Sequence, residues 1–170
     1  DKAIHDLIQK HQTDSADSAN PGNLQNVFLT GTTGFLGARL LKELLNKTNA
    51  TMHCLVRASS LQAALTRIEH ALSIHGMTLS DDEKKRIEPI MGDLTAKNLG
   101  MSDDQWLKLT QTADTVFHSA ATVNMIKDYY ELRPANVFGT REVVRFLLEG
   151  KRKHLHYAST LSVFVATTNN

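Results

Sequence analysis

Residues 27–39 read V-F-L-T-G-T-T-G-F-L-G-A-R, and this stretch decides the fold. An apolar run suited to a β-strand leads into Gly31, Gly34 and Gly37, spaced three residues apart, and then into an amphipathic segment. Glycines at these points remove the Cβ atoms that would keep a diphosphate away from the backbone and a helix away from its strand. The helix expected from residue 35 onward turns its free N–H groups and positive dipole end toward the same turn. The stretch therefore predicts a strand, a turn that binds a nucleotide diphosphate, and a helix.

The rest of the chain alternates between short apolar runs and segments with helical periodicity. Strands are expected at residues 26–30, 51–56, 87–91, 115–118 and 154–158. Helices are expected at residues 35–46 and 60–75, and a long one is expected to begin at Pro134 and continue to Glu149. Such alternation is typical of right-handed βαβ crossovers. It predicts an α/β fold, a Rossmann-type doubly wound parallel sheet, truncated, with strand order 3-2-1-4-5 and helices on both faces.

Polar residues mark the expected helix starts, and apolar residues mark the faces that the helices bury. Capping boxes are expected at three pairs, Ser59 with Gln62, Ser80 with Glu83, and Ser102 with Gln105. The first helix is expected to bury a stripe of leucines, Leu36, Leu40, Leu41, Leu44 and Leu45. The long helix carries a similar periodic set, Val137, Phe138, Val143, Val144 and Leu147.

The composition narrows the class of protein. A chain of 170 residues is expected to form one domain, and its net charge of +1 is too balanced for a protein that binds nucleic acid or an acidic membrane. No apolar stretch of about 18 residues and no signal peptide is found, so no membrane span is expected. The single cysteine, Cys54, lies in an apolar run and is expected to be a core residue. It excludes a disulfide framework and favours a reducing, cytoplasmic compartment.

The N-terminal residues differ in composition from the rest. Residues 3–9 could form a short helix, and residues 13–26 are rich in Ser, Asp, Asn, Pro and Gly, as a linker would be. We therefore expect a helix and interdomain linker over residues 1–23 and a dinucleotide-binding domain over residues 24–170. The chain begins at Asp1 and not at methionine, which suggests a piece of a longer polypeptide.

The context of the glycine turn favours a dinucleotide as its ligand, with a purely structural turn as the alternative. The glycines follow a strand and open a helix, and the chain has no Gly-Lys-Ser/Thr of a mononucleotide P-loop. Their spacing is G-x-x-G-x-x-G and not G-x-G-x-x-G. Four neighbours complete the candidate cofactor-binding residues of this turn, Thr30, Thr33, Phe35 and Leu36.

The residue twenty positions after Gly37 indicates which dinucleotide is bound. An NAD site has Asp or Glu near this point to accept from the ribose 2′-hydroxyl, whereas this chain has Arg57. A guanidinium cannot accept that bond but can hold a 2′-phosphate with two parallel hydrogen bonds, which favours NADP(H). Arg67 is a second candidate for that phosphate and Arg39 a third. The alternative for Arg57 is an ordinary surface arginine.

Several further runs carry a resemblance to a known family: C-L-V-R-A, G-D-L-T, V-F-H-S-A-A-T-V-N and A-N-V-F-G-T-R-E. Over residues 27–164 the chain resembles extended short-chain dehydrogenases/reductases, in particular the terminal thioester reductase domains of nonribosomal peptide synthetases and the reductase halves of carboxylic acid reductases. The resemblance implies an enzyme in which NADPH reduces an acyl thioester to an aldehyde, and in some members on to the alcohol. It also implies a partner, the phosphopantetheinylated carrier protein that bears the acyl or peptidyl thioester.

The resemblance implies further cofactor-binding residues after two strands. In Gly92-Asp93-Leu94, Asp93 would accept from the adenine amino group, and the alternative is a local cap of backbone N–H groups. In His118-Ser119-Ala120-Ala121, the small residues Ser119, Ala120 and Ala121 would let the backbone pass close to the dinucleotide. His118 itself is expected to be an oriented or packed histidine and not a catalyst.

Two asparagines are ambiguous. Asn136, in the long helix, occupies a position at which related enzymes contact the active site, and the alternative is a local hydrogen bond. Asn124 would line the substrate side, with the same alternative.

The resemblance also implies where the chemistry occurs. By alignment of residues 158–164, Thr160 takes the hydroxyl position that polarises the thioester carbonyl, and Ser159 is its nearest competitor. The proton would come from a tyrosine whose pKa is lowered by a lysine four residues later and by the nicotinamide's positive charge. No Y-x-x-x-K occurs in the 170 residues. We therefore expect these residues to bind NADPH, weakly or in part, and not to catalyse at a useful rate.

Two other functions stay open at this point. One is an extended-type epimerase or oxidoreductase that acts on nucleotide sugars or small carbonyls. The other is a dinucleotide-binding sensor without catalysis. In such a sensor the native gene itself would lack the Tyr-Lys pair. A metal site is not expected, because His154 and His156 have no carboxylate or thiolate companion in the sequence.

Overall fold

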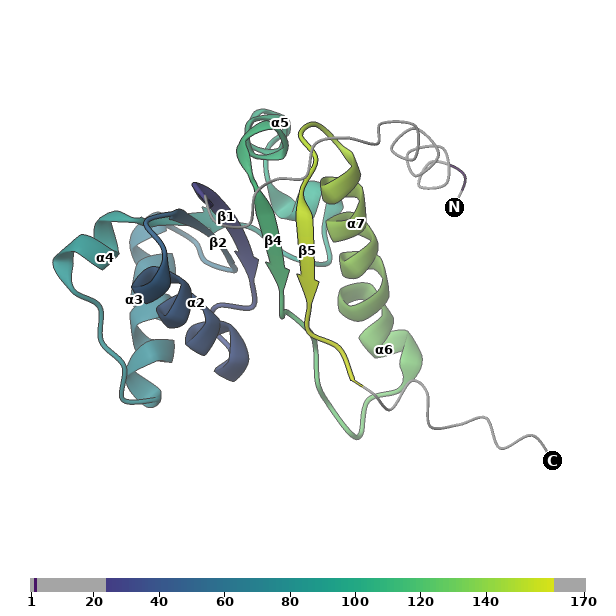
Figure 1. The fold of residues 1–170 in the computed structure, drawn as a ribbon. Coiled ribbons are helices and arrows are strands. Elements are labelled where there is room, and N and C mark those ends of the chain that lie inside the picture. The colour runs from purple at the N-terminus through teal and green to yellow at the C-terminus, as the bar shows by residue number, and fades with distance from the viewer. Residues whose placement is uncertain (1, 3–23, 161–170) are drawn as a thin grey trace.

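In the computed structural model, which describes residue 2 and residues 24–160, five parallel strands form one sheet (Figure 1). The strands are β1 (Asn26–Thr30), β2 (Thr51–Val56), β3 (Ile87–Met91), β4 (Thr115–His118) and β5 (His154–Tyr157). Their order is β3-β2-β1-β4-β5, which confirms the prediction. At the end of β1, Thr30 pairs with Leu55 on one side and with His118 on the other. The strand order reverses at this point, and open α/β sheets bind ligands at the carboxyl ends of the strands beside such a reversal.

Helical elements join the strands, and one cap differs from its prediction. The elements are α2 (Phe35–Lys47), α3 (Leu61–Ile74), α4 (Asp81–Lys85), η1 (Lys97–Gly100), α5 (Asp103–Thr112), α6 (Tyr129–Arg133), η2 (Pro134–Gly139) and α7 (Thr140–Leu148). Ser80 and Ser102 form the predicted capping boxes. The prediction for α3 was wrong by one residue, because the Ser60 hydroxyl, and not that of Ser59, accepts from the Ala63 N–H at 3.2 Å.

Helices cover both faces of the sheet, because successive side chains of a strand point to opposite sides. On one face Val27 and Leu29 pack against α2 and α3, in a core that also buries Cys54 as predicted. On the other face Phe28 packs against α5 and α7, with its ring centroid 4.8 Å from that of Phe146. The predicted doubly wound arrangement is thereby confirmed.

The buried stripes are narrower than predicted. In α2 the leucines Leu41 and Leu45 are buried, but Leu36 is 46% exposed, because Gly37 and Ala38 occupy the face of the first turn that meets the sheet. The long helix buries only part of the predicted set. Val143 is buried as predicted and Leu147 packs against the core, whereas Val137 and Phe138 are exposed and the unpredicted Phe146 is buried.

The prediction that Pro134 begins the long helix was wrong. Helical backbone runs from Tyr129 through α6, η2 and α7, and Pro134 lies inside it with φ −56° and ψ −46°. The helix begins after Asp128, whose carboxylate accepts from the Glu131 N–H at 3.0 Å. Because proline has no N–H to donate inside a helix, the hydrogen bonds shift, and residues 134–139 form a π-helical turn.

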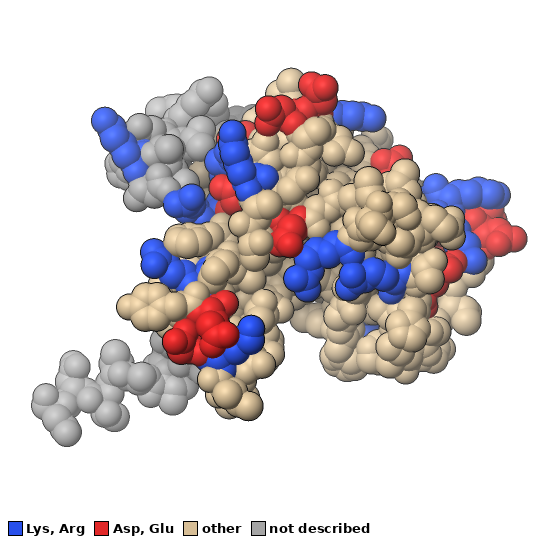
Figure 2. Space-filling model, turned by 180° about the vertical axis from the view of Figure 1, so that it is seen from behind, with Lys and Arg blue, Asp and Glu red and all other residues tan. Residues whose placement is uncertain are grey.

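The surface carries both signs of charge. Figure 2 shows basic and acidic side chains interspersed on one face, with a short row of Lys and Arg near its centre, in keeping with the net charge of +1. None of the helices that the structure describes combines the length and the apolar character of a membrane span. The helix predicted at residues 3–9, and the predicted linker up to residue 23, lie outside the described residues.

Candidate functional site

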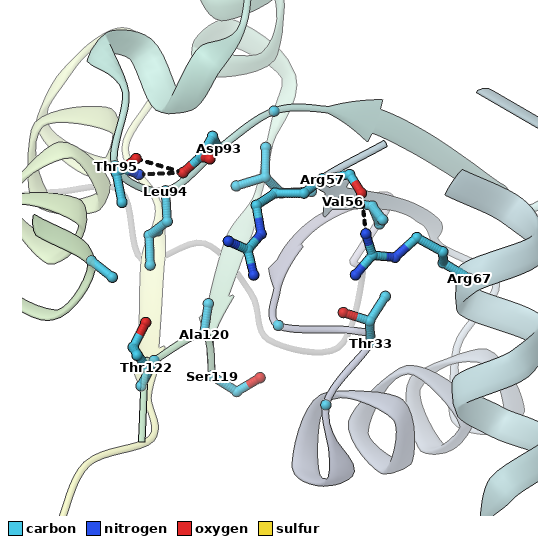
Figure 3. A pocket seen from close by; sticks show the side chains of 16 residues that line it. Thr33, Val56, Arg57, Arg67, Asp93, Leu94, Thr95, Ser119, Ala120 and Thr122 are labelled. Carbon is cyan, nitrogen blue, oxygen red and sulfur yellow. Dashed lines mark hydrogen bonds between the residues drawn. The ribbon is translucent and has the colours of Figure 1, made fainter. Parts of the chain in front are cut away.

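A pocket of about 240 Å³ opens at the carboxyl ends of β1, β2, β3 and β4 (Figure 3). Four loops that are far apart in the sequence meet there. The residues that line it are Gly31, Thr33, Gly34, Leu55, Val56, Arg57, Arg67, Gly92, Asp93, Leu94, Thr95, Ser119, Ala120, Ala121, Thr122 and Ala135.

The glycine turn forms one wall of the pocket, and it leaves no room for a side chain at Gly31 and Gly37. Gly31 has a φ of +83°, and a Cβ there would lie 2.7 Å from the Ala120 nitrogen. A Cβ on Gly37 would lie 2.0 Å from the Gly31 carbonyl oxygen, so glycine is required for α2 to start this close to β1. Gly34 is the N-cap of α2, and a Cβ there would meet only the Gly31 oxygen, at 3.4 Å. The space in front of the helix start is therefore open.

Some predicted residues of this turn do not line the pocket. Gly37 packs the helix against the turn, and the Phe35 and Leu36 side chains are 68% and 46% exposed. Thr30 is buried and holds the neighbouring loop instead. Its carbonyl oxygen accepts from the Ser119 N–H at 3.3 Å and from the Ser119 hydroxyl at 2.9 Å.

Two guanidinium groups face the pocket. Arg57 follows the end of β2, and Arg67 lies on α3. Nη1 of Arg67 donates to the Arg57 carbonyl oxygen at 2.6 Å, so the helix is tied to the strand end. Figure 3 shows both guanidinium groups turned into the space above Thr33 and Ala120. The third arginine considered, Arg39, lies on the exposed side of α2 and does not line the pocket.

The loop after β3 presents a carboxylate to the same pocket. Asp93 accepts from the Thr95 N–H and from the Thr95 hydroxyl, each at 2.8 Å. The bond from the Thr95 N–H and, less strongly, the positive charge of Arg57 hold the pKa of Asp93 below its ordinary value. Asp93 is therefore ionised at neutral pH, and it does cap local backbone as the alternative interpretation proposed.

This loop is fixed by close approaches of the backbone. Residues 98–100 have φ values of 53°, 55° and 78°, a left-handed turn that directs the Leu99 carbonyl oxygen to the Asp93 N–H at 2.8 Å. Gly139 lets the long helix approach the loop, since a Cβ there would lie 2.4 Å from Leu94 Cγ. Leu94 and Asp93 are thereby held at the pocket wall.

Asn136, in the long helix, holds the loop after β4 in place. Its Oδ1 accepts from the Thr122 N–H at 2.7 Å, and its Nδ2 donates to the Thr122 carbonyl oxygen at 2.9 Å. Asn136 itself does not line the pocket, and its two bonds go to a loop 14 residues away in the sequence. The structure therefore matches neither a direct contact with the pocket nor a local hydrogen bond within the helix. Asn124, by contrast, closes a local turn by accepting from the Ile126 and Lys127 N–H groups at 2.9 and 3.0 Å.

The predicted catalytic residue lies apart from the pocket lining. Thr160 follows β5 by three residues and is exposed, and neither it nor Ser159 lines the pocket. His118 is buried at the end of β4 and bonds to two threonine hydroxyls. Among the described residues, no three His, Cys, Asp or Glu side chains gather as metal ligands would.

The pocket has the donors that a dinucleotide requires. The N-terminus of α2 and the two guanidinium groups of Arg57 and Arg67 suit phosphate oxygens. The buried hydroxyl of Thr32, inside the glycine turn, has no hydrogen-bond partner within the described part of the chain. Leu55 and Leu94 add apolar surface for a flat ring.

Six lining residues were not predicted, namely Leu55, Val56, Gly92, Thr95, Thr122 and Ala135. Five of them, all but Ala135, lie at or just after the end of a strand, within two residues of a predicted residue, and this position was the signal that could have found them. Ala135 had no such signal, because it reaches the pocket from inside a helix whose start was misplaced.

Comparisons with known proteins agree with this geometry. The model of an NAD-binding family described as Male sterility protein matches residues 29–170. Isonitrile lipopeptide synthase of Streptomyces coeruleorubidus is 42% identical over 142 residues, which is 84% of this chain and 10% of that protein.

Two solved structures are similar over most of the chain. The terminal R domain from the myxalamid PKS-NRPS biosynthetic pathway has a TM-score of 0.80 and 35% identity, over 92% of this chain and 42% of that one. A thiolation-reductase di-domain from an archaeal non-ribosomal peptide synthetase has a TM-score of 0.69 and 26% identity, over 98% of this chain and 34% of that one. The chain thus spans less than half the length of each of these relatives.

Proposed function

Because the chain belongs to the NAD-binding family described as Male sterility protein, a family whose cofactor is a nicotinamide dinucleotide, we propose that it is the NADPH-binding part of a thioester reductase. The full enzyme would reduce an acyl thioester on a carrier protein to an aldehyde, or further to the alcohol. Within this proposal, residues 24–170 form the NADP-binding domain, which contains no Y-x-x-x-K pair, and residues 1–23 form a helix and interdomain linker.

One observation carries the preference for NADPH, the pair of guanidinium groups beside the glycine turn. Arg57 occupies the strand end from which an acidic residue would accept from a ribose 2′-hydroxyl, and a guanidinium only donates. Arg67 reaches the same side of the pocket and is tied to Arg57 by the 2.6 Å bond. Two cationic donors at this point suit the 2′-phosphate of NADPH and give no preference for the 2′-hydroxyl of NADH.

The other lining residues have roles that follow from their chemistry. The open N-terminus of α2 at Gly34 receives the diphosphate, and the ionised Asp93 accepts from the adenine amine.

The chemistry that bound NADPH supplies is a hydride for the thioester carbonyl. Thr160 polarises that carbonyl by donating a hydrogen bond, with Ser159 as the competitor for this role.

The carrier-protein substrate is supported by what the relatives are called. One similar structure is described as a thiolation-reductase di-domain, in which a thiolation domain accompanies the reductase.

The 170 residues contain no Y-x-x-x-K, so we expect them to bind the cofactor without turnover. In the native gene, a carrier domain should precede this segment and a Y-x-x-x-K pair should follow it. Finding neither would contradict the thioester reductase assignment.

Calorimetry tests the cofactor assignment with two matched pairs of ligands. NADPH should bind more tightly than NADH, and 2′,5′-ADP more tightly than 5′-AMP, which differs from it only by the 2′-phosphate. Equal affinities within each pair would reject the phosphate site. Absence of binding by all four ligands would reject the dinucleotide site itself.

A further inference from the structure

A chain of hydrogen bonds links the long helix to the end of β1 through the buried ring of His118. Nε2 of His118 lies 3.2 Å from the Thr140 hydroxyl, and Nδ1 lies 2.6 Å from the Thr30 hydroxyl. His118 is 1% exposed, and its ring also stacks on that of Tyr157, with centroids 5.1 Å apart. The ring therefore has one orientation and two fixed partners.

The partners determine where the protons are. The Thr140 hydroxyl donates to the Asn136 carbonyl oxygen at 2.8 Å, so its only proton is used and its oxygen can only accept. Nε2 of His118 must therefore carry the proton, which leaves Nδ1 as the acceptor of the neutral ring. The Thr30 hydroxyl consequently donates to Nδ1, and its oxygen is left to accept from the Ala120 N–H at 3.3 Å.

The same bonds decide which peptide groups of the pocket wall are available. In residues 119–122, the Ser119 N–H donates to the Thr30 carbonyl, the Ala120 N–H to the Thr30 hydroxyl, and the Thr122 N–H to Asn136. The Ala121 N–H donates to no described residue, and Ala121 lines the pocket. The loop is thus held by its neighbours at three amides, and the fourth, that of Ala121, has no partner among the described residues.

We propose that His118, as the neutral Nε2–H tautomer, is a positioning residue for the dinucleotide. It orients the Thr30 hydroxyl, which fixes Ala120 and so presents the Ala121 N–H to the bound cofactor. This inference rests on the proposed function, because it requires that the pocket bind a dinucleotide. Burial lowers the pKa of His118 to about 4, which keeps the ring neutral at physiological pH.

Two substitutions at His118 separate positioning from packing. An asparagine oxygen can replace Nδ1 as the acceptor for Thr30, whereas a glutamine amide can replace Nε2 as the donor to Thr140. His118→Gln should therefore weaken NADPH binding about tenfold, and His118→Asn should retain most of the affinity. If His118 acted by packing alone, the smaller asparagine would leave the larger cavity and should give the greater loss.

Substitutions at Thr30 complete the test. Thr30→Val removes the hydroxyl at nearly constant volume and should weaken NADPH binding about as much as His118→Gln, with no further loss in the double variant, while Thr30→Ser should restore binding. Thr115→Val is the matched control, since it removes a buried hydroxyl bond to the His154 carbonyl at the far end of β4. It should lose stability and keep its affinity. Multiplying effects of Thr30→Val and His118→Gln, or equal weakening by Thr115→Val, would overturn the proposal.

Two further measurements keep this inference separate from the proposed function. Nitrogen chemical shifts of His118 in the 170-residue chain should report a protonated Nε2 and an unprotonated Nδ1, and the opposite tautomer would contradict the argument. If the unmodified chain does not bind NADPH, the proposed function fails. Hydrogen exchange of the Ala120 amide then decides the positioning role, with faster exchange expected in His118→Gln and not in His118→Asn.

Discussion

Nη1 of Arg67 donates a hydrogen bond of 2.6 Å to the carbonyl oxygen of Arg57. The bond joins α3 to the end of β2. The positions from which the two guanidinium groups enter the pocket are therefore fixed relative to each other (Figure 3). An isolated surface arginine would lose its side-chain freedom when it bound a phosphate. Here the bond restrains the Arg67 side chain and the Arg57 backbone before any phosphate binds.

Arg57→Glu should reverse the cofactor preference. The new carboxylate can accept from a ribose 2′-hydroxyl and repels a 2′-phosphate, so NADPH affinity should fall by about 10- to 100-fold while NADH affinity stays equal or rises. Calorimetry with both cofactors measures the ratio. Lys108→Glu, on the exposed face of α5, makes the same change of charge away from the pocket and should leave the ratio unaltered. Unchanged NADPH affinity in Arg57→Glu would show that the phosphate site lies elsewhere.

Two glycines of the same turn should respond differently to alanine. Gly37→Ala places a methyl group 2.0 Å from the Gly31 carbonyl oxygen, and relief requires backbone movement. We expect the free energy of unfolding to fall by about 1–3 kcal/mol, measured by urea denaturation. Gly34→Ala meets only one atom, at 3.4 Å, and should unfold like the unmodified chain. Its methyl group narrows the open helix start, so NADPH binding should weaken. A stable Gly37→Ala variant would mean that α2 can move away from β1.

Asn136→Asp should damage the pocket wall that Asn124→Asp leaves intact. Asn136 both accepts from and donates to Thr122, so a carboxylate keeps the first bond and sets an anion against a carbonyl oxygen in place of the second. NADPH affinity should fall about tenfold. Asn124 uses only its Oδ1, as an acceptor for two N–H groups, and a carboxylate preserves both bonds. Equal affinities in the two variants would exclude a role for the Thr122 bonds in cofactor binding.

The stability of the chain should fall between pH 6.5 and pH 4. Burial lowers the pKa of His118 from 6.5 to about 4, so within this window the unfolded chain binds a proton that the folded chain does not. The free energy of unfolding therefore decreases as the pH falls, by about 3 kcal/mol across the full window. His53, whose pKa burial also lowers, acts in the same direction.

Denaturation at pH 7 and pH 5 isolates the contribution of His118. The unmodified chain should lose more stability between these values than His118→Asn, which has no ring to protonate. His53→Asn, compared in the same way, gives the share of the other histidine. Equal pH dependence in the unmodified chain and His118→Asn would mean that the His118 ring is protonated as easily in the folded chain as in the unfolded one.

The sequence predicted the sheet better than the helices that cross it. Apolar runs and their separations were enough to locate five strands and their order. Parallel strands that are buried on both faces and joined by right-handed crossovers allow few other strand orders. The start of the long helix was misplaced, because Pro134 is typical of a first turn and only the Asp128 cap reveals the earlier start. The adjacent serines Ser59 and Ser60 offer nearly equivalent caps, so their sequence could not decide between them.

The candidate site divides in the same way. Arg57 could be predicted from its distance along the chain after Gly37, and Asp93 from the family resemblance at the end of a strand. The roles of Thr30 and Asn136 could not, because each depends on a partner in a loop from elsewhere in the sequence. Thr160 was assigned by resemblance alone, and its role stays a prediction.

The pairing of β1 with β4 also has a consequence for biosynthesis. Thr30 and His118 are 88 positions apart, so this contact closes a long loop, whereas β1 meets β2 soon after both are made. Parallel pairs with such separation form slowly. On the ribosome, the glycine turn therefore emerges well before the wall at residues 119–122 can join it. A ligand that binds only the finished pocket favours the closed state by mass action. When the cofactor is scarce, newly made chains should therefore spend longer without the contact between β1 and β4, and should be more open to proteolysis.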